Sequence, residues 1–211
     1  FRPRRSCLYM PGSNAKALAK AGALPADMLV LDLEDAVAPE QKADARAAVG
    51  HRLAVGDLGH REVLVRCNGL DSEWGRDDLA ASVSAGADGV LLPKVTSAGE
   101  VFSIDSVLDD FGADAGLGLW ARIEMPLALG NIREIAAAAR DTRLVGLVMG
   151  LNDLAKELRA TPTADRHAFQ SARSRTVLAA RAFDLIALDA VFNDIAVEAG
   201  LRAECEQGRA L

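Results

Sequence analysis

Two acidic residues follow successive apolar runs of the sequence, at positions where a metal ion could bind. Glu124 comes near the end of the run 119–125, and Asp153 comes shortly after the run 145–149. Neighbouring strands of a sheet lie about 4.8 Å apart, so acids at their ends can reach one cation. Magnesium prefers such oxygen ligands and takes one or two carboxylates from a protein. The pattern predicts a Mg2+ site; an ion pair of Glu124 with a nearby arginine and a helix cap by Asp153 are the structural alternatives.

Arg66 ends another apolar run, and the three acids Asp32, Glu34 and Asp35 end the run before it. A guanidinium offers a planar fork of donors that can hold a substrate carboxylate or phosphate at two points. The alternative for Arg66 is a structural ion pair with Asp32 or Glu34. Three acids within four positions repel one another unless they are paired or serve the site. Lys94 could form a Schiff base, but a lysine at a strand end more often pairs with acids.

The elements that must position these residues are short apolar runs, which alternate with alanine-rich amphipathic stretches. This alternation is typical of βα units in a parallel sheet. A capping box at Ser97 and Glu100 marks one helix start. The predicted strands are 5–10, 28–33, 62–67, 89–95, 119–125, 145–149 and 185–191, and the predicted helices are 14–24, 39–54, 73–85, 97–111, 127–139, 168–183 and 195–208.

Seven βα units without a GxGxxG motif or a Walker loop favour a TIM (β/α)8 barrel over a nucleotide-binding sheet. In such barrels the active site lies at the carboxyl ends of the strands, which is where the acids and Arg66 fall. A complete barrel needs about 250 residues and an eighth strand. We therefore expect residues 1–211 to form a single α/β domain that lacks the eighth strand and a C-terminal segment. The edge of the first strand would then be unpaired or covered by a neighbouring chain.

The composition excludes several classes of protein. The 211 residues carry 24 Lys and Arg against 30 Asp and Glu, a net charge of −6, and only 4% are aromatic, which argues against a nucleic-acid-binding surface. The sequence shows no apolar run long enough for a membrane span and no secretory leader. The three cysteines lack the spacing of zinc ligands and are expected to be reduced. We expect a soluble, cytoplasmic protein whose partner is a small molecule.

An ordered set of short motifs runs along almost the whole chain and resembles the citrate lyase beta subunit family, of the HpcH/HpaI aldolase group. Each motif is weak alone, but their order is specific. The motifs are RSCLYMPGSN at 5–14, LDLEDAV at 31–37 with Lys42, Ala45 and Arg46 after it, VRCNG at 65–69, LPKV at 92–95, IEMP at 123–126 and GLNDL at 150–154. The resemblance implies a barrel of the phosphoenolpyruvate/pyruvate type, acyl-CoA thioester substrates, magnesium and a trimeric assembly.

The resemblance also implies roles for individual residues. Glu124 and Asp153 would be the magnesium ligands, Arg66 would hold a substrate carboxylate, and Arg5 would lie in the mouth of the barrel near the acyl-CoA. Leu151-Asn152 departs from the small residue and glutamate that more often precede the metal-binding aspartate.

The reaction that the resemblance implies is a retro-Claisen cleavage of citryl-CoA, malyl-CoA or methylmalyl-CoA to an acyl-CoA and a 2-oxo acid. Glu34, Asp35 or an acid beyond Leu211 would take the hydroxyl proton. Two other functions stay open. One is a metal-dependent aldolase that acts on free 2-oxo acids, and the other is a non-catalytic subunit of a lyase complex that binds CoA or an acyl carrier.

Overall fold

The computed structural model describes residues 2–211, and their contacts cluster in two compact units. The first unit contains the residues up to Pro93 together with Ser103–Leu119. The second contains Lys94–Phe102 together with Trp120–Leu211. The chain passes from one unit to the other three times: after Pro93, within α4 (Ala98–Asp110) and within β5 (Gly118–Ile123).

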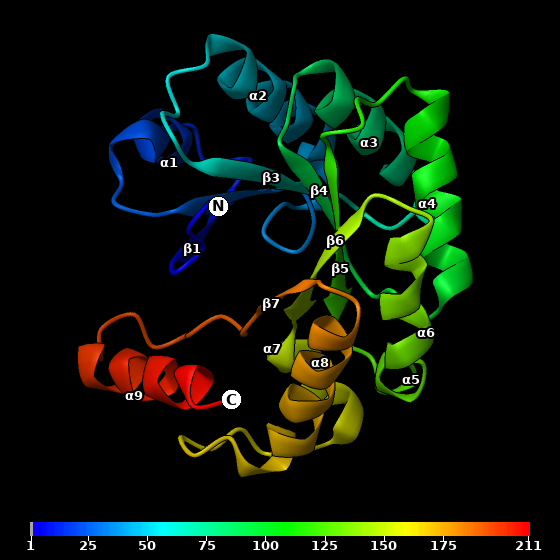
Figure 1. The fold of residues 1–211 in the computed structure, drawn as a ribbon. Coiled ribbons are helices and arrows are strands. Elements are labelled where there is room, and N and C mark those ends of the chain that lie inside the picture. Colours follow the sequence, from blue (N-terminus) through cyan, green and yellow to red (C-terminus); the bar gives the residue numbers. More distant parts are fainter. Residues whose placement is uncertain (1) are drawn as a thin grey trace. The chain divides into compact units, whose positions relative to one another are not determined.

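The first unit consists of parallel strands with α1, α2 and α3 on one side of them (Figure 1). Strands β1 to β4 are neighbours in that order, and β2 and β3 are buried along their whole length. Strands that are buried on both faces are almost continuously apolar, which made these runs visible in the sequence. The elements are β1 (Cys7–Pro11), α1 (Ala15–Lys20), β2 (Met28–Asp32), α2 (Lys42–Val55), β3 (Glu62–Arg66), α3 (Gly75–Ser84) and β4 (Gly89–Leu92), with short 3-10 helices at Ala21–Ala23 and Pro39–Gln41.

The pairing register brings the strand ends of the first unit to one edge. Pro11 at the end of β1 stands opposite Asp32 at the end of β2. Asp32 in turn stands opposite Arg66 at the end of β3. Residues that were predicted to carry chemistry therefore lie side by side at the carboxyl edge of these strands.

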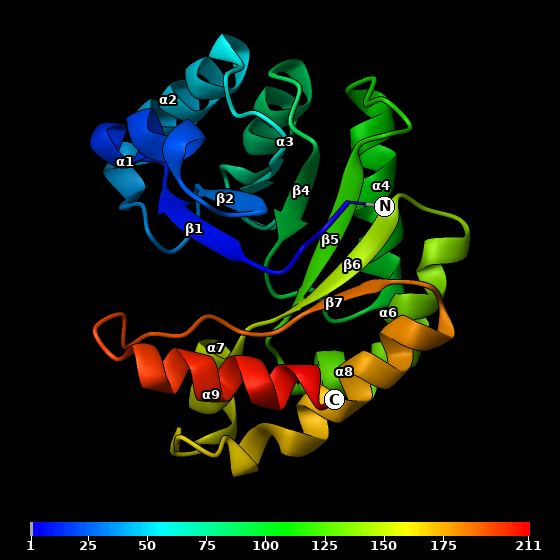
Figure 2. The same ribbon diagram turned by 60° about the vertical axis from the view of Figure 1, so that its left-hand side comes forward.

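The second unit holds the later strands, in the order β5, β6 and β7, and the helices that follow them (Figure 2). β6 and β7 pair in parallel, with Gly146 opposite Ile186. A Cβ atom at Gly146 would lie 2.2 Å from the ring of Trp120, so the buried indole needs a glycine there. The further elements are α5 (Pro126–Gly130), α6 (Ile132–Ala137), β6 (Leu144–Met149), α7 (Leu151–Leu158), α8 (Gln170–Ala182), β7 (Ile186–Leu188) and α9 (Glu198–Arg209), with 3-10 helices at Ala138–Arg140 and His167–Phe169.

The seven predicted strands are all present, and no eighth strand lies within residues 2–211. One half of the predicted capping box is formed, because the Glu100 N–H donates to Ser97 Oγ at 3.2 Å. In the other half, the Glu100 carboxylate accepts from the N–H of Thr96 and not from that of Ser97. The expectation of a single domain over residues 1–211 stays a prediction. The expectation that the edge of β1 is unpaired or covered by a neighbouring chain also stays a prediction.

The helices differ from prediction in two places. The helix expected over 127–139 breaks at Asn131 into α5 and α6, and α7 was not expected as a helix of its own. α7 is a short helix that ends at Leu158, and the next residue, Arg159, has a left-handed φ of 52°. Eight residues between a strand and a loop give too little periodicity for a prediction.

The composition led to expectations about the cysteines and about membrane-spanning segments. Cys7, Cys67 and Cys205 are free cysteines, and burial raises the pKa of Cys7 to about 12, with a further contribution from the charge of Glu62. Within residues 2–211, every helix is too short or too polar to span a bilayer.

Candidate active site

Arg66 at the end of β3 forms a two-point ion pair with Asp32 at the end of β2. The Nε and Nη2 atoms of Arg66 lie 2.7 and 2.5 Å from the two carboxylate oxygens of Asp32. Both side chains are almost fully buried. Burial by itself would lower the pKa of Arg66, but the hydrogen bonds and charge of Asp32, with those of Glu34 and Asp35, raise it. The guanidinium therefore stays charged in this setting.

The acidic run that follows β2 is held by this arginine and by its own backbone. Asp32 accepts hydrogen bonds from the N–H groups of Glu34 and Ala36, at 2.9 and 3.3 Å, which shapes the turn. Nη1 of Arg66 lies 2.7 Å from Glu34 and 3.0 Å from Asp35. The structural ion pair that sequence reasoning left as an alternative is therefore formed, and it explains how three acids can share one turn.

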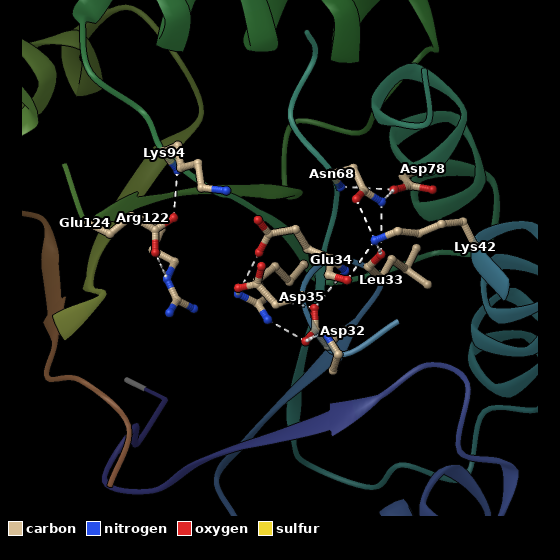
Figure 3. A network of polar contacts seen from close by, with 12 residues as sticks. Asp32, Leu33, Glu34, Asp35, Lys42, Asn68, Asp78, Lys94, Arg122 and Glu124 are labelled. Atoms are coloured by element: carbon tan, nitrogen blue, oxygen red, sulfur yellow. Dashed lines mark hydrogen bonds and ion pairs between the residues drawn. The ribbon is translucent and has the colours of Figure 1, made fainter. Parts of the chain in front are cut away.

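Lys42 supports the same turn from α2 (Figure 3). Its ammonium donates to the carbonyl groups of Leu33 and Glu34, both at 2.7 Å, and to Oδ1 of Asn68 at 2.8 Å. Asn68 in turn donates to the carbonyl of Leu33 and to Asp78. Burial lowers the pKa of Lys42, and the nearby acids oppose this shift. This network fixes the backbone that carries the acidic run to the turn after β3.

Sequence reasoning gave Lys42 no role and treated Asn68 as uninformative. The available signal was weak: Lys42 is the first residue of α2 and belongs to the buried side of an otherwise amphipathic helix. A buried lysine needs hydrogen-bond acceptors. Since the alanines of its own helix offer none in their side chains, the acceptors have to come from neighbouring turns.

Replacing Lys42 by methionine is expected to lower the free energy of unfolding by about 2–4 kcal/mol. The change leaves two carbonyl groups and an amide oxygen without their charged donor, and such bonds are worth about 1.5–3 kcal/mol each before relaxation. Urea unfolding of Lys42→Met, compared with the exposed Lys16→Met on α1, measures the difference. Equal stability of the two variants would show that the ammonium does not hold the turn.

The second unit carries the predicted acid pair, of which Figure 3 shows Glu124 with Lys94 and Arg122. Glu124 directly follows β5 and is completely buried. One of its oxygens accepts the N–H of Lys94 at 2.9 Å, and the other is paired with Nε of Arg122. Asp153, in the first turn of α7, interacts with Glu124 and contributes to raising its pKa. A Cβ atom at Gly150 would lie 2.5 Å from Glu124, so a glycine lets the carboxyl group occupy this position.

The electrostatics of the pair favour replacement of a proton by a cation. Burial raises the pKa of Glu124 to about 7, Arg122 opposes the shift, and the contact with Asp153 adds to it. Glu124, directly after β5, and Asp153, in the first turn of α7, supply carboxylate oxygens, which are hard ligands of the kind that Mg2+ takes. Residues 2–211 contain no group of three or more acidic, histidine or cysteine ligands, so water or substrate would complete the coordination. The residues present fit a magnesium ion.

Of the two structural alternatives for Glu124 and Asp153, the ion pair is formed and the helix cap is not. The ion pair of Glu124 with an arginine is formed, and the partner is Arg122. The helix cap is not formed by Asp153, because α7 begins after Gly150 and has no side-chain cap. Lys94 contributes its backbone N–H, and its φ of 53° is left-handed, which is unusual for a lysine.

A pair of amides joins α7 to the segment after β7 within the second unit. Asn152 donates to Asn193 at 3.2 Å, and Asn193 donates back to Asn152 at 2.8 Å. Asn152 directly precedes Asp153, at the position where the sequence departs from the more frequent motif. The asparagine therefore has a partner that supports the first turn of α7.

Arg5 lies at the opposite edge of the first unit from Arg66. It precedes β1 and forms hydrogen bonds to both oxygens of Asp27, which precedes β2, with its backbone N–H and its guanidinium. The hydrogen bonds with Arg5 lower the pKa of Asp27. Two other arginines of the same segment bind acids at the amino ends of β3 and β4; the pairs are Arg4–Glu62 and Arg2–Asp88. Arg5 thus belongs to a row of ion pairs at the amino ends of the strands, and the structure does not bring it to the carboxyl edge.

Three comparisons relate the chain to known proteins. The family model described as HpcH/HpaI aldolase/citrate lyase matches residues 5–211. A (3S)-malyl-CoA thioesterase of Cereibacter sphaeroides is 48% identical over 207 residues, which span 98% of this chain and 70% of that protein. The citrate lyase subunit beta of Escherichia coli is 39% identical over 96% of this chain and 68% of its own length.

A solved structure shows the same fold. The protein CitE of Mycobacterium tuberculosis, in complex with magnesium, acetoacetate and coenzyme A, matches with a TM-score of 0.80 and 32% identity, over 100% of this chain and 74% of that chain. The predicted class, an α/β fold of the TIM type with seven parallel strands, is confirmed by this likeness and by the strands themselves.

Proposed function

This chain belongs to the HpcH/HpaI aldolase/citrate lyase family, and on that premise we propose that it cleaves a malyl-CoA-type thioester into an acyl-CoA and a 2-oxo acid with the help of Mg2+. The observation that carries the proposal is the buried carboxyl group of Glu124 and its interaction with the half-buried Asp153. A similar solved structure holds magnesium, acetoacetate and coenzyme A, which supports the same ligand classes here.

Glu124 and Asp153 would hold the metal ion. When bound, Mg2+ supplies positive charge that makes the substrate hydroxyl easier to deprotonate and stabilises the oxyanion. Arg122 and the N–H of Lys94 each contact one oxygen of Glu124 and so fix the orientation of its carboxylate. This preorganisation matters because a site that has to rearrange during the reaction loses electrostatic stabilisation.

Arg66 would bind the free carboxylate of the substrate, and an acid of the turn after β2 would take the hydroxyl proton. Asp35 suits the second role better than Glu34, because its side chain is 54% exposed whereas that of Glu34 is 9% exposed. Loss of the proton lets the carbon–carbon bond beside the hydroxyl carbon break. Its electron pair passes to the thioester fragment, which leaves as an enolate and takes up a proton.

Hydrolysis of the thioester is the second candidate function. The observation that favours it is the 48% identity to a protein named (3S)-malyl-CoA thioesterase. Water would then attack the thioester carbonyl, the carbon–sulfur bond would break, and the products would be the free hydroxy acid and the CoA thiol. Both reactions need a bound carboxylate and a base, so the site alone supports either.

The products distinguish these functions. Incubation with malyl-CoA and MgCl2 is expected to give equal amounts of 2-oxo acid, measured as its phenylhydrazone, and acyl-CoA, measured by chromatography, without free CoA thiol. Release of thiol without 2-oxo acid would identify a thioesterase. Cleavage of a free hydroxylated 2-oxo acid without CoA would identify an aldolase, and calorimetric CoA binding without any cleavage would identify a binding subunit.

A further inference from the structure

The three acids around Arg66 are not equivalent, although all three lie within 3.0 Å of its guanidinium. The side chain of Asp32 is 3% exposed and binds at two points, and that of Glu34 is 9% exposed. The side chain of Asp35 is 54% exposed and binds through a single oxygen, at 3.0 Å from Nη1.

Exposure decides which of these ion pairs is easiest to open. A buried ion pair is costly to break, because the group that is left behind keeps its charge without water. An exposed pair contributes little, because water and salt screen it and solvate both groups when they separate. Asp35 is therefore the one acid that can leave Arg66 while the rest of the cluster stays intact.

The backbone of this turn does not have to move when Asp35 leaves. The N–H groups of Glu34 and Ala36, on either side of Asp35, are held by Asp32. The carbonyl groups of Leu33 and Glu34 are held by Lys42. Rotation of the Asp35 side chain alone thus releases a donor on Nη1.

We propose that Asp35 is an exchangeable ligand of Arg66, which occupies the position of the substrate carboxylate in the free protein and is displaced when that carboxylate binds. The identity of the anion, a 2-oxo or 2-hydroxy acid, rests on the proposed function. A fourth carboxylate could not join the three acids without strong repulsion, so binding requires an exchange. The exchange also moves the Asp35 carboxylate off Arg66 while it stays beside the bound substrate, where it could act as a base.

The expected signature is tighter binding of a small carboxylate when Asp35 loses its charge. Asp35→Asn and Asp35→Ala should lower the Kd for pyruvate by about two- to fivefold, the range that an exposed ion pair supplies. Calorimetric titration with pyruvate in MgCl2, without CoA, measures binding in the absence of turnover. The gain should shrink in high salt, because salt already weakens the competing pair.

Asp44→Asn is the matched control, since it removes one exposed carboxylate from α2 by the same chemical change. The Kd for pyruvate should stay at the wild-type value in this variant. Unchanged, weaker or undetectable pyruvate binding in both Asp35 variants would overturn the proposal. Because Asp35 is exposed, its variants should unfold at the wild-type urea concentration, which separates the binding effect from a folding defect.

The pyruvate-binding experiment and the thioester-cleavage experiment can fail independently of each other. If the Asp35 variants bind pyruvate more tightly but the wild-type protein cleaves no thioester, the exchange stands and the lyase assignment fails. If malyl-CoA is cleaved while the Asp35 variants show no tighter binding, the exchange fails and the lyase assignment stands. If the exchange and the lyase activity both hold, Asp35→Asn should lower KM and kcat together. KM falls because no carboxylate at position 35 competes with the substrate, and kcat falls because the base is missing.

Discussion

Glu124→Gln and Asp153→Asn should each lower kcat/KM for malyl-CoA more than about a hundredfold and remove the chelator-sensitive part of the activity. Changes to groups that only support metal ligands cost about 10–100-fold, so loss of a ligand itself should cost more. Assays with and without EDTA, together with calorimetric Mg2+ titration, measure both effects. The exposed Glu134→Gln on α6 is the control and should keep full activity.

The pH dependence provides an independent check of the same pair. Because burial raises the pKa of Glu124 to about 7, a proton competes with the metal ion below that pH. The affinity of the wild-type protein for Mg2+ should therefore rise between pH 6 and pH 8. If both variants retain wild-type turnover and metal affinity, the two acids do not bind the ion.

The stability of the wild-type protein depends on pH through the raised pKa of Glu124. A carboxyl group whose pKa is raised in the folded state binds more protons there than in the unfolded chain. Its contribution to stability is therefore present at low pH and is lost as the pH rises through 7. Glutamine removes this penalty at pH 8, but it also takes a charged partner from the buried guanidinium of Arg122. Urea unfolding of the variant at pH 8 therefore has to accompany the assay, and loss of activity in a variant that is still folded at that pH would reflect the missing ligand.

Arg66→Met is expected to cost about 3–5 kcal/mol of unfolding free energy, in addition to its effect on substrate binding. The change leaves the buried carboxylates of Asp32 and Glu34 without their cation, and breaking a buried ion pair on one side has a cost of this size. Urea unfolding monitored by circular dichroism measures it. The exposed Arg133→Met on α6 should change stability by no more than about 0.5 kcal/mol.

A second variant distinguishes a lost charge pair from lost packing. Adding Asp32→Asn to Arg66→Met removes one of the unpaired charges, so the double variant should be less destabilised than the sum of the single variants. Additive effects would show that Arg66 contributes to stability through its packing, for example against the ring of Tyr9, whose centroid lies 5.5 Å away. That result would contradict the electrostatic account.

The fold was readable in the sequence because of burial. β2, β3 and β5 are buried along their length, so their residues form nearly continuous apolar runs that stand out without any tertiary information. α7 was missed for the opposite reason, since eight residues provide about two turns of periodicity. The placement of Asp32 and Arg66 side by side also followed from the sequence, because polar residues that end parallel strands lie at the carboxyl edge of the sheet.

The partners of those residues could not be read in the same way. Arg66 was expected to be available to a substrate, but the structure gives it three acids. Arg5 was placed in the mouth because its motif resembles that of the family, but it precedes β1 and binds Asp27 at the amino edge. Lys42 has no chemical motif around it, and only the fold shows that it holds two carbonyl groups.

The sequence by itself determined the order and type of the elements, the strand edge at which Asp32 and Arg66 lie, and the family resemblance, because all three depend on the order of residue types along the chain. Only the tertiary structure decided which charges pair, which carboxyl groups are buried and which remain exposed. Hydrogen bonds and ion pairs form between side chains that are far apart in the chain, and their strength depends on the water that surrounds them. Neither property is a function of sequence spacing.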